Sequence, residues 1–199
     1  MNRRAPLLCG LVLLAGCATA ANQSAVPPSA APPSPESSTS SSAPVQLVST
    51  AGARFDIPAG WQTRPGSINP SGNRPLLFIG PAALPSDCVE TATGGECHAW
   101  PDLHLVAGSA VFAWREHGMP GSHPPAGGDA LTVDGRPAHI LRGSADESCA
   151  AIGGDESIAV ALQPAQGQDG WTGIDACLAG PDHVPAEAAF QGMLDSVSW

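Results

Sequence analysis

Residues 131–141 read Leu131-Thr132-Val133-Asp134-Gly135-Arg136-Pro137-Ala138-His139-Ile140-Leu141. Apolar residues alternate with polar ones on both sides of Asp134-Gly135, and this dipeptide suits the positive backbone angles of a two-residue hairpin turn. Pro137 has no backbone N–H to donate, so the second strand should begin at or after Pro137, or lie at a sheet edge there. The stretch therefore predicts an antiparallel β-hairpin.

Short apolar runs on either side of this hairpin predict further strands. They cover residues 54–57, 76–79, 103–112 with an interruption at Gly108, 157–162 and 171–178. A Gly-Gln-Asp-Gly turn at 167–170 precedes the last run, so we expect it to pair antiparallel with residues 157–162.

Residues 185–194 predict a helix. Pro185 suits its first turn, Glu187 suits the positive end of the helix dipole, and Phe190, Met193 and Leu194 lie on one face. The order of elements predicts an α+β fold, an antiparallel β-sheet flanked by helices. We expect residues 45–199 to form one globular domain with its own core.

Three segments carry a family resemblance. They are Phe55-Asp56-Ile57-Pro58-Ala59-Gly60-Trp61, Val133-Asp134-Gly135-Arg136-Pro137-Ala138, and residues 190–199. They resemble the opening strand, the middle hairpin, and the closing helix and last strand of PsbP-like domains, which occur in actinobacterial lipoproteins. The resemblance implies an antiparallel sheet flanked by helices and carries over no catalytic residue. Residues 81–128 depart from the family's pattern.

The N-terminal segment is typical of a secretory signal. Arg3 and Arg4 precede an apolar run that is too short to span a membrane, and residues 1–16 are predicted to be a signal peptide. Leu14-Ala15-Gly16-Cys17 resembles the bacterial lipobox. The resemblance implies that Cys17 becomes the acylated first residue and anchors the protein at the extracytoplasmic face of the cell membrane. An ordinary secretory signal with an incidental cysteine is the alternative.

Residues 17–44 are rich in Ser, Pro and Ala, and Glu36 is their one charged residue. Such a segment cannot bury enough apolar surface to offset its ordering entropy, so we expect a disordered tether. Fully extended, residues 18–44 would reach roughly 80 Å at about 3.1 Å per residue. Serines and threonines next to prolines are possible glycosylation sites.

The charge balance excludes several classes of function. Without residues 1–16 the chain has 6 Arg, no Lys and 18 Asp and Glu, a formal charge of −12. Such a surface repels phosphate backbones and disfavours nucleic-acid binding. The missing lysines exclude a Schiff-base lysine and a Walker-type phosphate loop, and the sequence implies no cofactor. Abundant Ala, Gly, Pro and Arg favour a GC-rich genome.

Four cysteines remain once Cys9 leaves with the signal peptide and Cys17 is acylated, namely Cys88, Cys97, Cys149 and Cys177. An even number in an exported domain predicts two disulfides. Three pairings are possible. We favour Cys88 with Cys97 and Cys149 with Cys177, because each pair is nearest in sequence. A zinc site would need tighter spacing.

The densest polar cluster surrounds the first cysteine pair and comprises Asp87, Glu90, Glu96, His98, Asp102 and His104. These residue types could hold a divalent cation for a metal-assisted hydrolase, but a solvated acidic loop explains them as well. His117 and His123 are expected in a surface loop, and Ser109 and Ser122 lack a nucleophile elbow. The acidic pairs Asp146-Glu147 and Asp155-Glu156 predict exposed turns around Cys149.

Two tryptophans carry different expectations. Trp61 follows a strand and is expected to fill the core, whereas Trp100 follows a cysteine loop and is the candidate for an exposed binding surface. Together with the anchor, tether and disulfides, this favours a non-catalytic binding or scaffolding module with an envelope protein or small ligand as its partner. The alternatives are the metal-assisted hydrolase and a structural envelope protein.

Overall fold

The computed structural model describes residues 44–67, 73–92, 94–118, 122–164 and 170–199. The predicted signal peptide, the predicted acylation site Cys17, and the predicted tether as far as Ala43 lie outside the described residues. Those predictions therefore rest on the sequence.

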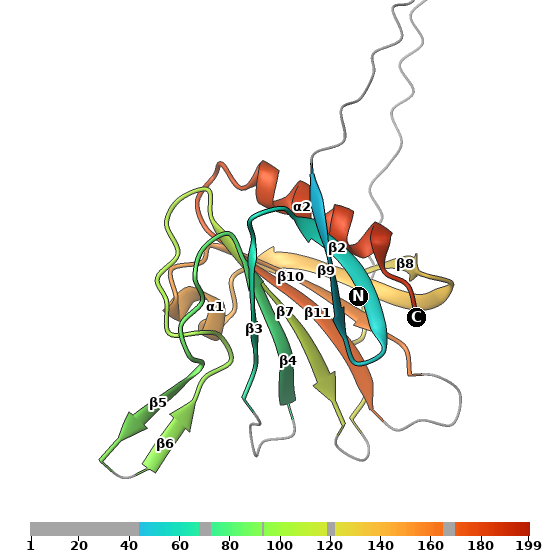
Figure 1. Ribbon diagram of the computed structural model, residues 1–199. Helices are drawn as coiled ribbons and strands as arrows, with labels where there is room; N and C mark the ends of the chain where they lie inside the picture. The colour runs from blue at the N-terminus through green and yellow to red at the C-terminus, as the bar shows by residue number, and fades with distance from the viewer. Residues whose placement is uncertain (1–43, 68–72, 93, 119–121, 165–169) are drawn as a thin grey trace, which may run out of the picture. The chain divides into compact units, whose positions relative to one another are not determined.

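A seven-stranded antiparallel sheet forms the centre of the domain (Figure 1). Its strands run in the order β3(Gln62–Pro65), β4(Asn73–Gly80), β7(Ala110–His117), β11(Trp171–Leu178), β10(Glu156–Leu162), β9(Arg136–Ser144) and β8(Asp129–Val133). Two separate hairpins consist of β1(Val45–Thr50) with β2(Ala53–Pro58), and β5(Cys88–Thr91) with β6(Gly94–Cys97). The helices are α1(Glu147–Ala151) and α2(Val184–Ser196).

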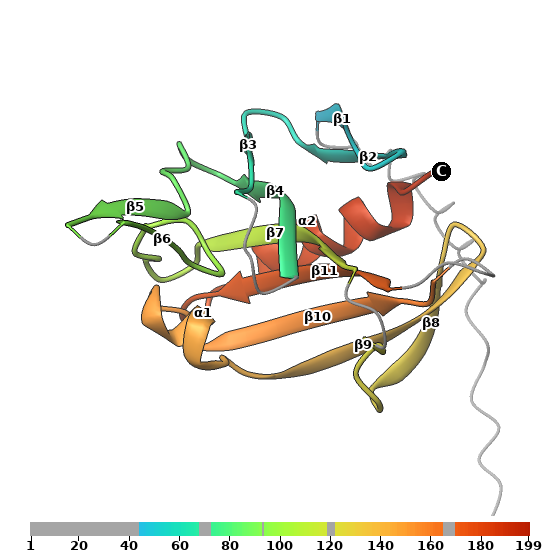
Figure 2. The same ribbon diagram turned by 90° about the horizontal axis from the view of Figure 1, so that it is seen from below.

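One face of the sheet packs against α2 and the β1–β2 hairpin, which lie on the same side of it (Figure 2). Strand β7 is buried on both faces, and alternate residues such as Phe112 and Trp114 point into this larger core. Phe55 of β2 stacks on Trp114, and Phe190 of α2 packs edge-on against Phe112. This side is thus an aromatic core of the kind that the period-two alternation predicts.

The opposite face carries a smaller core. Val111 and Ala113 of β7 face it with Phe78 of β4. No long helix among the described residues covers this face; instead Trp100 and other apolar side chains of the chain between β4 and β7 pack on it, together with α1.

The predicted α+β class with a sheet flanked by helices is wrong. The described residues form eleven strands and two helices, and α1 has only five residues, so the fold is mostly β. The physical reason lies in residues 81–109, where prolines, glycines and a disulfide prevent a covering helix. The β5–β6 hairpin and irregular chain take the place of that helix.

Most predicted elements are present. Asp134 and Gly135 have φ angles of 45° and 76° and connect β8 to β9 in a two-residue turn. Pro137 lies opposite Thr132, one residue after the start of β9. The predicted antiparallel pairing of β10 with β11 and the C-terminal helix are confirmed. The strand expected over 103–112 is wrong, because Gly108 has a positive φ and the strand begins only at Ala110.

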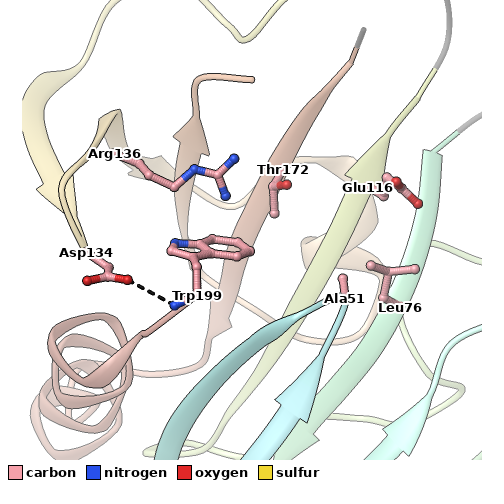
Figure 3. A pocket seen from close by; sticks show the side chains of 7 residues that line it. All are labelled: Ala51, Leu76, Glu116, Asp134, Arg136, Thr172 and Trp199. Atoms are coloured by element: carbon pink, nitrogen blue, oxygen red, sulfur yellow. Dashed lines mark hydrogen bonds between the residues drawn. The ribbon is translucent and has the colours of Figure 1, made fainter. Parts of the chain in front are cut away.

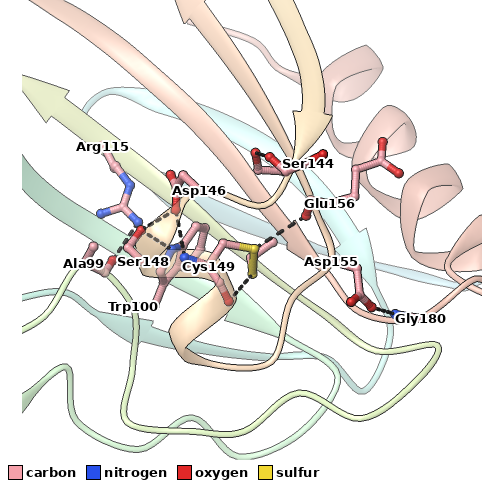
Figure 4. The surroundings of a disulfide bond; sticks show 12 residues. Ala99, Trp100, Arg115, Ser144, Asp146, Ser148, Cys149, Asp155, Glu156 and Gly180 are labelled. Atoms are coloured by element: carbon pink, nitrogen blue, oxygen red, sulfur yellow. Dashed lines mark hydrogen bonds between the residues drawn. A yellow bond between two sulfur atoms is a disulfide. The ribbon is translucent and has the colours of Figure 1, made fainter.

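Both favoured cysteine pairs form disulfides. Cys88 and Cys97 lie opposite each other on β5 and β6. Cys149 lies in α1, just before β10, and its bond to Cys177 near the end of β11 fastens α1 to the sheet (Figure 4). Gly154 lies so close that an added Cβ would be 2.3 Å and 2.4 Å from these two sulfurs.

Candidate functional site

The acidic and histidine residues expected around the first disulfide do not converge. Asp87 is buried, and its carboxylate accepts hydrogen bonds from the Ser67 N–H at 2.9 Å and the Ser67 hydroxyl at 2.8 Å. Glu90 and Glu96 lie on the β5–β6 hairpin, and His98, Asp102 and His104 are exposed. Within the described part of the chain, no group of three His, Cys, Asp or Glu residues could hold a metal ion.

Ser109, Ser122 and His117 make contacts that stabilise the local structure. The Ser109 hydroxyl donates to the Val106 carbonyl, and that of Ser122 to the His117 carbonyl. His123 is exposed, as expected. His117 was expected in a surface loop, but it ends β7 and stacks on Trp171 with 3.6 Å between ring centroids. Burial, and then the charge of Arg115, lower the pKa of His117 from 6.5 to about 4.

Three of the four acidic residues around Cys149 are exposed, as predicted, and the fourth, Glu156, is not. Asp146 is exposed and caps α1 through the Cys149 N–H, and Glu147 and Asp155 are exposed as well. Glu156 is half-buried and lies 3.2 Å from the His183 imidazole. The Asp155 carboxylate accepts from the Gly180 N–H (Figure 4). The carboxylates of Asp146, Asp155 and Glu156 therefore have structural partners.

Trp100 is not exposed, contrary to its sequence-based expectation. Only 4% of Trp100 is accessible, its ring lies 4.6 Å from the Arg115 guanidinium carbon, and its indole N–H donates to the Ser148 hydroxyl. The reason is that the apolar side chains on this face of the sheet must be shielded from water. Trp100 supplies that shield, because the chain from β4 to β7 folds back over the sheet.

Arg115 is the one buried cation among the described residues. Its Nε donates to Asp175 at 2.7 Å and its Nη2 to the Ala99 carbonyl at 2.6 Å, while its Nη1 has no hydrogen-bond partner. Burial raises the pKa of the Asp175 carboxyl above its usual range, although the adjacent Arg115 charge opposes this effect. The pair fixes β7 to β11, and the hollow beside it has a volume of about 140 Å³, which is below the range of about 300–1,000 Å³ that is typical of small-molecule sites.

Trp199 is instead the exposed tryptophan, with 39% of its surface accessible. The chain after α2 returns to the β1–β2 hairpin, where the backbones of Ser198 and Arg54 exchange two hydrogen bonds of 2.8 Å. The Trp199 N–H then donates to the Asp134 carboxylate at 2.9 Å (Figure 3). The ring packs edge-on against Trp114, so the larger core supports it from below.

Arg136 lies over this ring. Its guanidinium carbon is 4.1 Å from the ring centre of Trp199, a cation–π distance. Arg136 directly follows the Asp134-Gly135 turn, so the hairpin positions both the cation over the indole and the carboxylate that holds the Trp199 backbone.

An open hollow of about 620 Å³ lies beside Trp199, and we call it the Trp199 hollow. Its lining consists of Ala51, Leu76, Glu116, Asp134, Arg136, Thr172 and Trp199 (Figure 3). The volume falls in the range of small-molecule sites, and the lining combines the apolar Ala51 and Leu76 and the ring of Trp199 with polar and charged side chains. We therefore take the Trp199 hollow as the candidate binding site.

The sequence offered partial signals for this site. Trp199 was expected only to close the domain, and Asp134-Gly135 only to make a turn. Neither expectation shows that the two meet, because 65 residues separate Asp134 from Trp199 in the chain. Trp61, by contrast, packs on the larger core and contacts Phe112, as expected.

Comparison of the chain with protein-family models and with curated proteins found no match in either. The resemblances to PsbP-like domains and to bacterial lipoproteins therefore stay predictions from the sequence. None of the described helices has the length and apolar character needed to cross a membrane.

Proposed function

We propose that this protein is a lipid-anchored module of the cell envelope, held at the extracytoplasmic membrane face through Cys17, that binds a ligand in the Trp199 hollow without catalysing a reaction. The lipobox resemblance and the Ser/Pro-rich segment before the domain support the location. The two disulfides suit an oxidising compartment outside the cytoplasm.

The observation that carries the binding function is the exposed indole of Trp199 under the Arg136 guanidinium, at the border of a 620 Å³ hollow. A large aromatic ring left accessible beside a concave surface costs hydration free energy that a ligand would recover. The support from Trp114 beneath and Asp134 at the backbone holds the ring in place before a ligand arrives. Such preorganisation lowers the entropy lost on binding.

NMR spectroscopy of the indole N–H groups tests this proposal. The full chain would be prepared with Cys17→Ser, to avoid the acyl group, and the Trp199 signal assigned by its loss in Trp199→Phe. A fractionated extract of the producing organism's cell envelope should shift the Trp199 signal and leave that of Trp100, buried under the opposite face, unchanged. If no fraction moves the Trp199 signal, the hollow is not the binding site.

A further inference from the structure

The arginines of the domain differ in how they are neutralised. Four of the six described arginines have a partner: Arg64 donates to the Leu84 carbonyl, Arg74 lies 3.9 Å from Glu116, Arg115 pairs with Asp175, and Arg142 pairs with Glu187. Within the described residues, the guanidinium groups of Arg54 and Arg136 have no carboxylate within ion-pair distance. Arg64 also lacks a carboxylate but donates to a carbonyl, so among the described arginines Arg54 and Arg136 are the two whose guanidinium groups have neither a hydrogen-bond acceptor nor a carboxylate partner.

Both of these arginines border Trp199. Arg136 lines the Trp199 hollow, whereas Arg54 lines a second open hollow of about 500 Å³. Ala51 and Trp199 line both hollows, so the two hollows adjoin at the indole. Arg54 reaches this place because its backbone pairs with Ser198, the residue before Trp199.

The carboxylates nearby are already engaged. Asp134 accepts the Trp199 N–H, and Glu116, which is more than half exposed, lies within ion-pair distance of Arg74. Among the side chains that line the two hollows, Arg54 and Arg136 balance Asp134 and Glu116, so the lining side chains are neutral in sum. In the whole chain 18 Asp and Glu stand against 8 Lys and Arg, so this neutral lining repels an anion less than the acidic surface does on average.

We propose, on the basis of the function proposed above, that the ligand of the Trp199 hollow is a small anion with a carboxylate or phosphate group next to a planar or apolar group. The anionic group binds the free N–H edge of Arg136, which stacking on Trp199 holds in a fixed plane. A guanidinium held in this way suits the planar, bidentate recognition of carboxylate or phosphate. The apolar part of the ligand contacts Trp199 and Leu76.

The role of Arg54 in this proposal is long-range. Because Arg54 is exposed and borders the neighbouring hollow, its charge raises the potential at the site without contacting the ligand. Its contribution should weaken with salt, since exposed charges are screened over about 8 Å at physiological ionic strength.

Matched probes test the charge requirement. The Cys17→Ser chain would be titrated with 2-naphthoate, 1-naphthyl phosphate and the neutral 2-naphthamide, with the Trp199 indole signal as the readout. We expect at least one anionic probe to bind about tenfold more tightly than the amide. The carboxylate and phosphate arms show which anion the site prefers.

Substitutions then assign the effect to residues. Arg136→Ala should abolish the preference for the anionic probe, and Arg54→Ala should weaken its binding about twofold to threefold at low salt. Arg142→Ala removes the same charge from an exposed pair elsewhere and should change affinity less than twofold.

Equal affinity for the amide and the anions, or an anion preference that survives Arg136→Ala, would overturn the inference. So would the absence of binding by either anion at millimolar concentration. If an envelope fraction still shifts the Trp199 signal in that case, the binding function stands and only the class of ligand is wrong.

Discussion

The Arg115 guanidinium lies 2.7 Å from the Asp175 carboxylate, on the face of the sheet that Trp100 covers. The side chain of Arg115 is only 4% exposed and that of Asp175 is 21% exposed. A buried pair of this kind connects two strands. It leaves the folding free energy little changed when both partners are present, but loss of one partner leaves a buried charge that destabilises the fold.

Removing one partner of this pair should therefore cost more than removing both. We expect Asp175→Leu to destabilise the domain by about 3 kcal/mol, because it leaves the Arg115 charge buried without its carboxylate. The double variant Arg115→Met with Asp175→Leu should lose less. Urea unfolding of the wild type, the Asp175→Leu variant and the double variant measures the difference in the free energy of unfolding.

The exposed pair Arg142 with Glu187 provides the control for that cycle, and its removal should cost about 0–1 kcal/mol. A double variant of the buried pair that is less stable than Asp175→Leu alone would contradict the argument.

His117 should make stability depend on pH. Its pKa of about 4 in the folded protein lies below the ordinary value of 6.5, so the unfolded chain takes up a proton first as the pH falls. The contribution of neutral His117 to the free energy of unfolding is complete above pH 6.5 and is lost as the pH falls from 6.5 to about 4. His117→Phe keeps an aromatic ring against Trp171 but has no group that titrates in this range. Between pH 7 and pH 4.5 this variant should lose less stability than the wild type does. The difference should be on the order of 1 kcal/mol, because His117 is partly exposed. Denaturant unfolding at both pH values checks this, with His123→Phe as a control that should match the wild type.

The two disulfides should contribute unequally. The residues of the Cys149–Cys177 pair are 28 apart in sequence and those of the Cys88–Cys97 pair are 9 apart. In the chain-entropy model, the longer loop contributes about 3–4 kcal/mol and the shorter one about 1 kcal/mol less. We expect Cys149→Ala with Cys177→Ala to lower the melting temperature more than Cys88→Ala with Cys97→Ala, because the first pair also leaves a gap in the smaller core. If calorimetry shows that the loss of Cys88–Cys97 lowers the melting temperature as much as the loss of Cys149–Cys177 does, or more, the prediction is wrong. The β5–β6 hairpin would then contribute more to stability than its loop length predicts.

Cys17 should determine membrane attachment. With Cys17→Ala we expect unprocessed precursor or released protein, because the thiol that receives the diacylglyceryl group is missing. Fractionation of cells expressing either form tests this, with Cys88→Ala plus Cys97→Ala as a cysteine control that should stay with the membrane. If the Cys17→Ala protein is cleaved and still sediments with membranes like the wild type, the anchor lies elsewhere.

Local signals in the sequence were enough to predict two strand pairings, β8 with β9 and β10 with β11, but they did not predict β1, β3, β5 or β6. The Asp134-Gly135 turn is a two-residue element, so its neighbours specify the β8–β9 hairpin. The same locality made Cys149 and Cys177 predictable, because antiparallel pairing of β10 with β11 brings the end of one strand to the start of the other.

Exposure was not predictable in the same way. Whether Trp100 or Trp199 remains accessible depends on which segment covers each face of the sheet, and that is decided by packing between distant parts of the chain. For the same reason the acidic cluster looked like one site in the sequence, whereas Asp87 turns away to Ser67. The prediction that helices flank the sheet was wrong for the same reason. The irregular chain between β4 and β7 covers one face of the sheet, where a helix was expected.

Gly154 places a restriction on how this protein can vary. A Cβ at this position would overlap both sulfurs of the Cys149–Cys177 bond, so any larger residue prevents the bond from closing in its present geometry. During oxidative folding, such a substitution would leave two thiols free to exchange with the other cysteine pair. Among natural or engineered variants, a glycine at 154 and the two cysteines should accordingly be kept together or lost together.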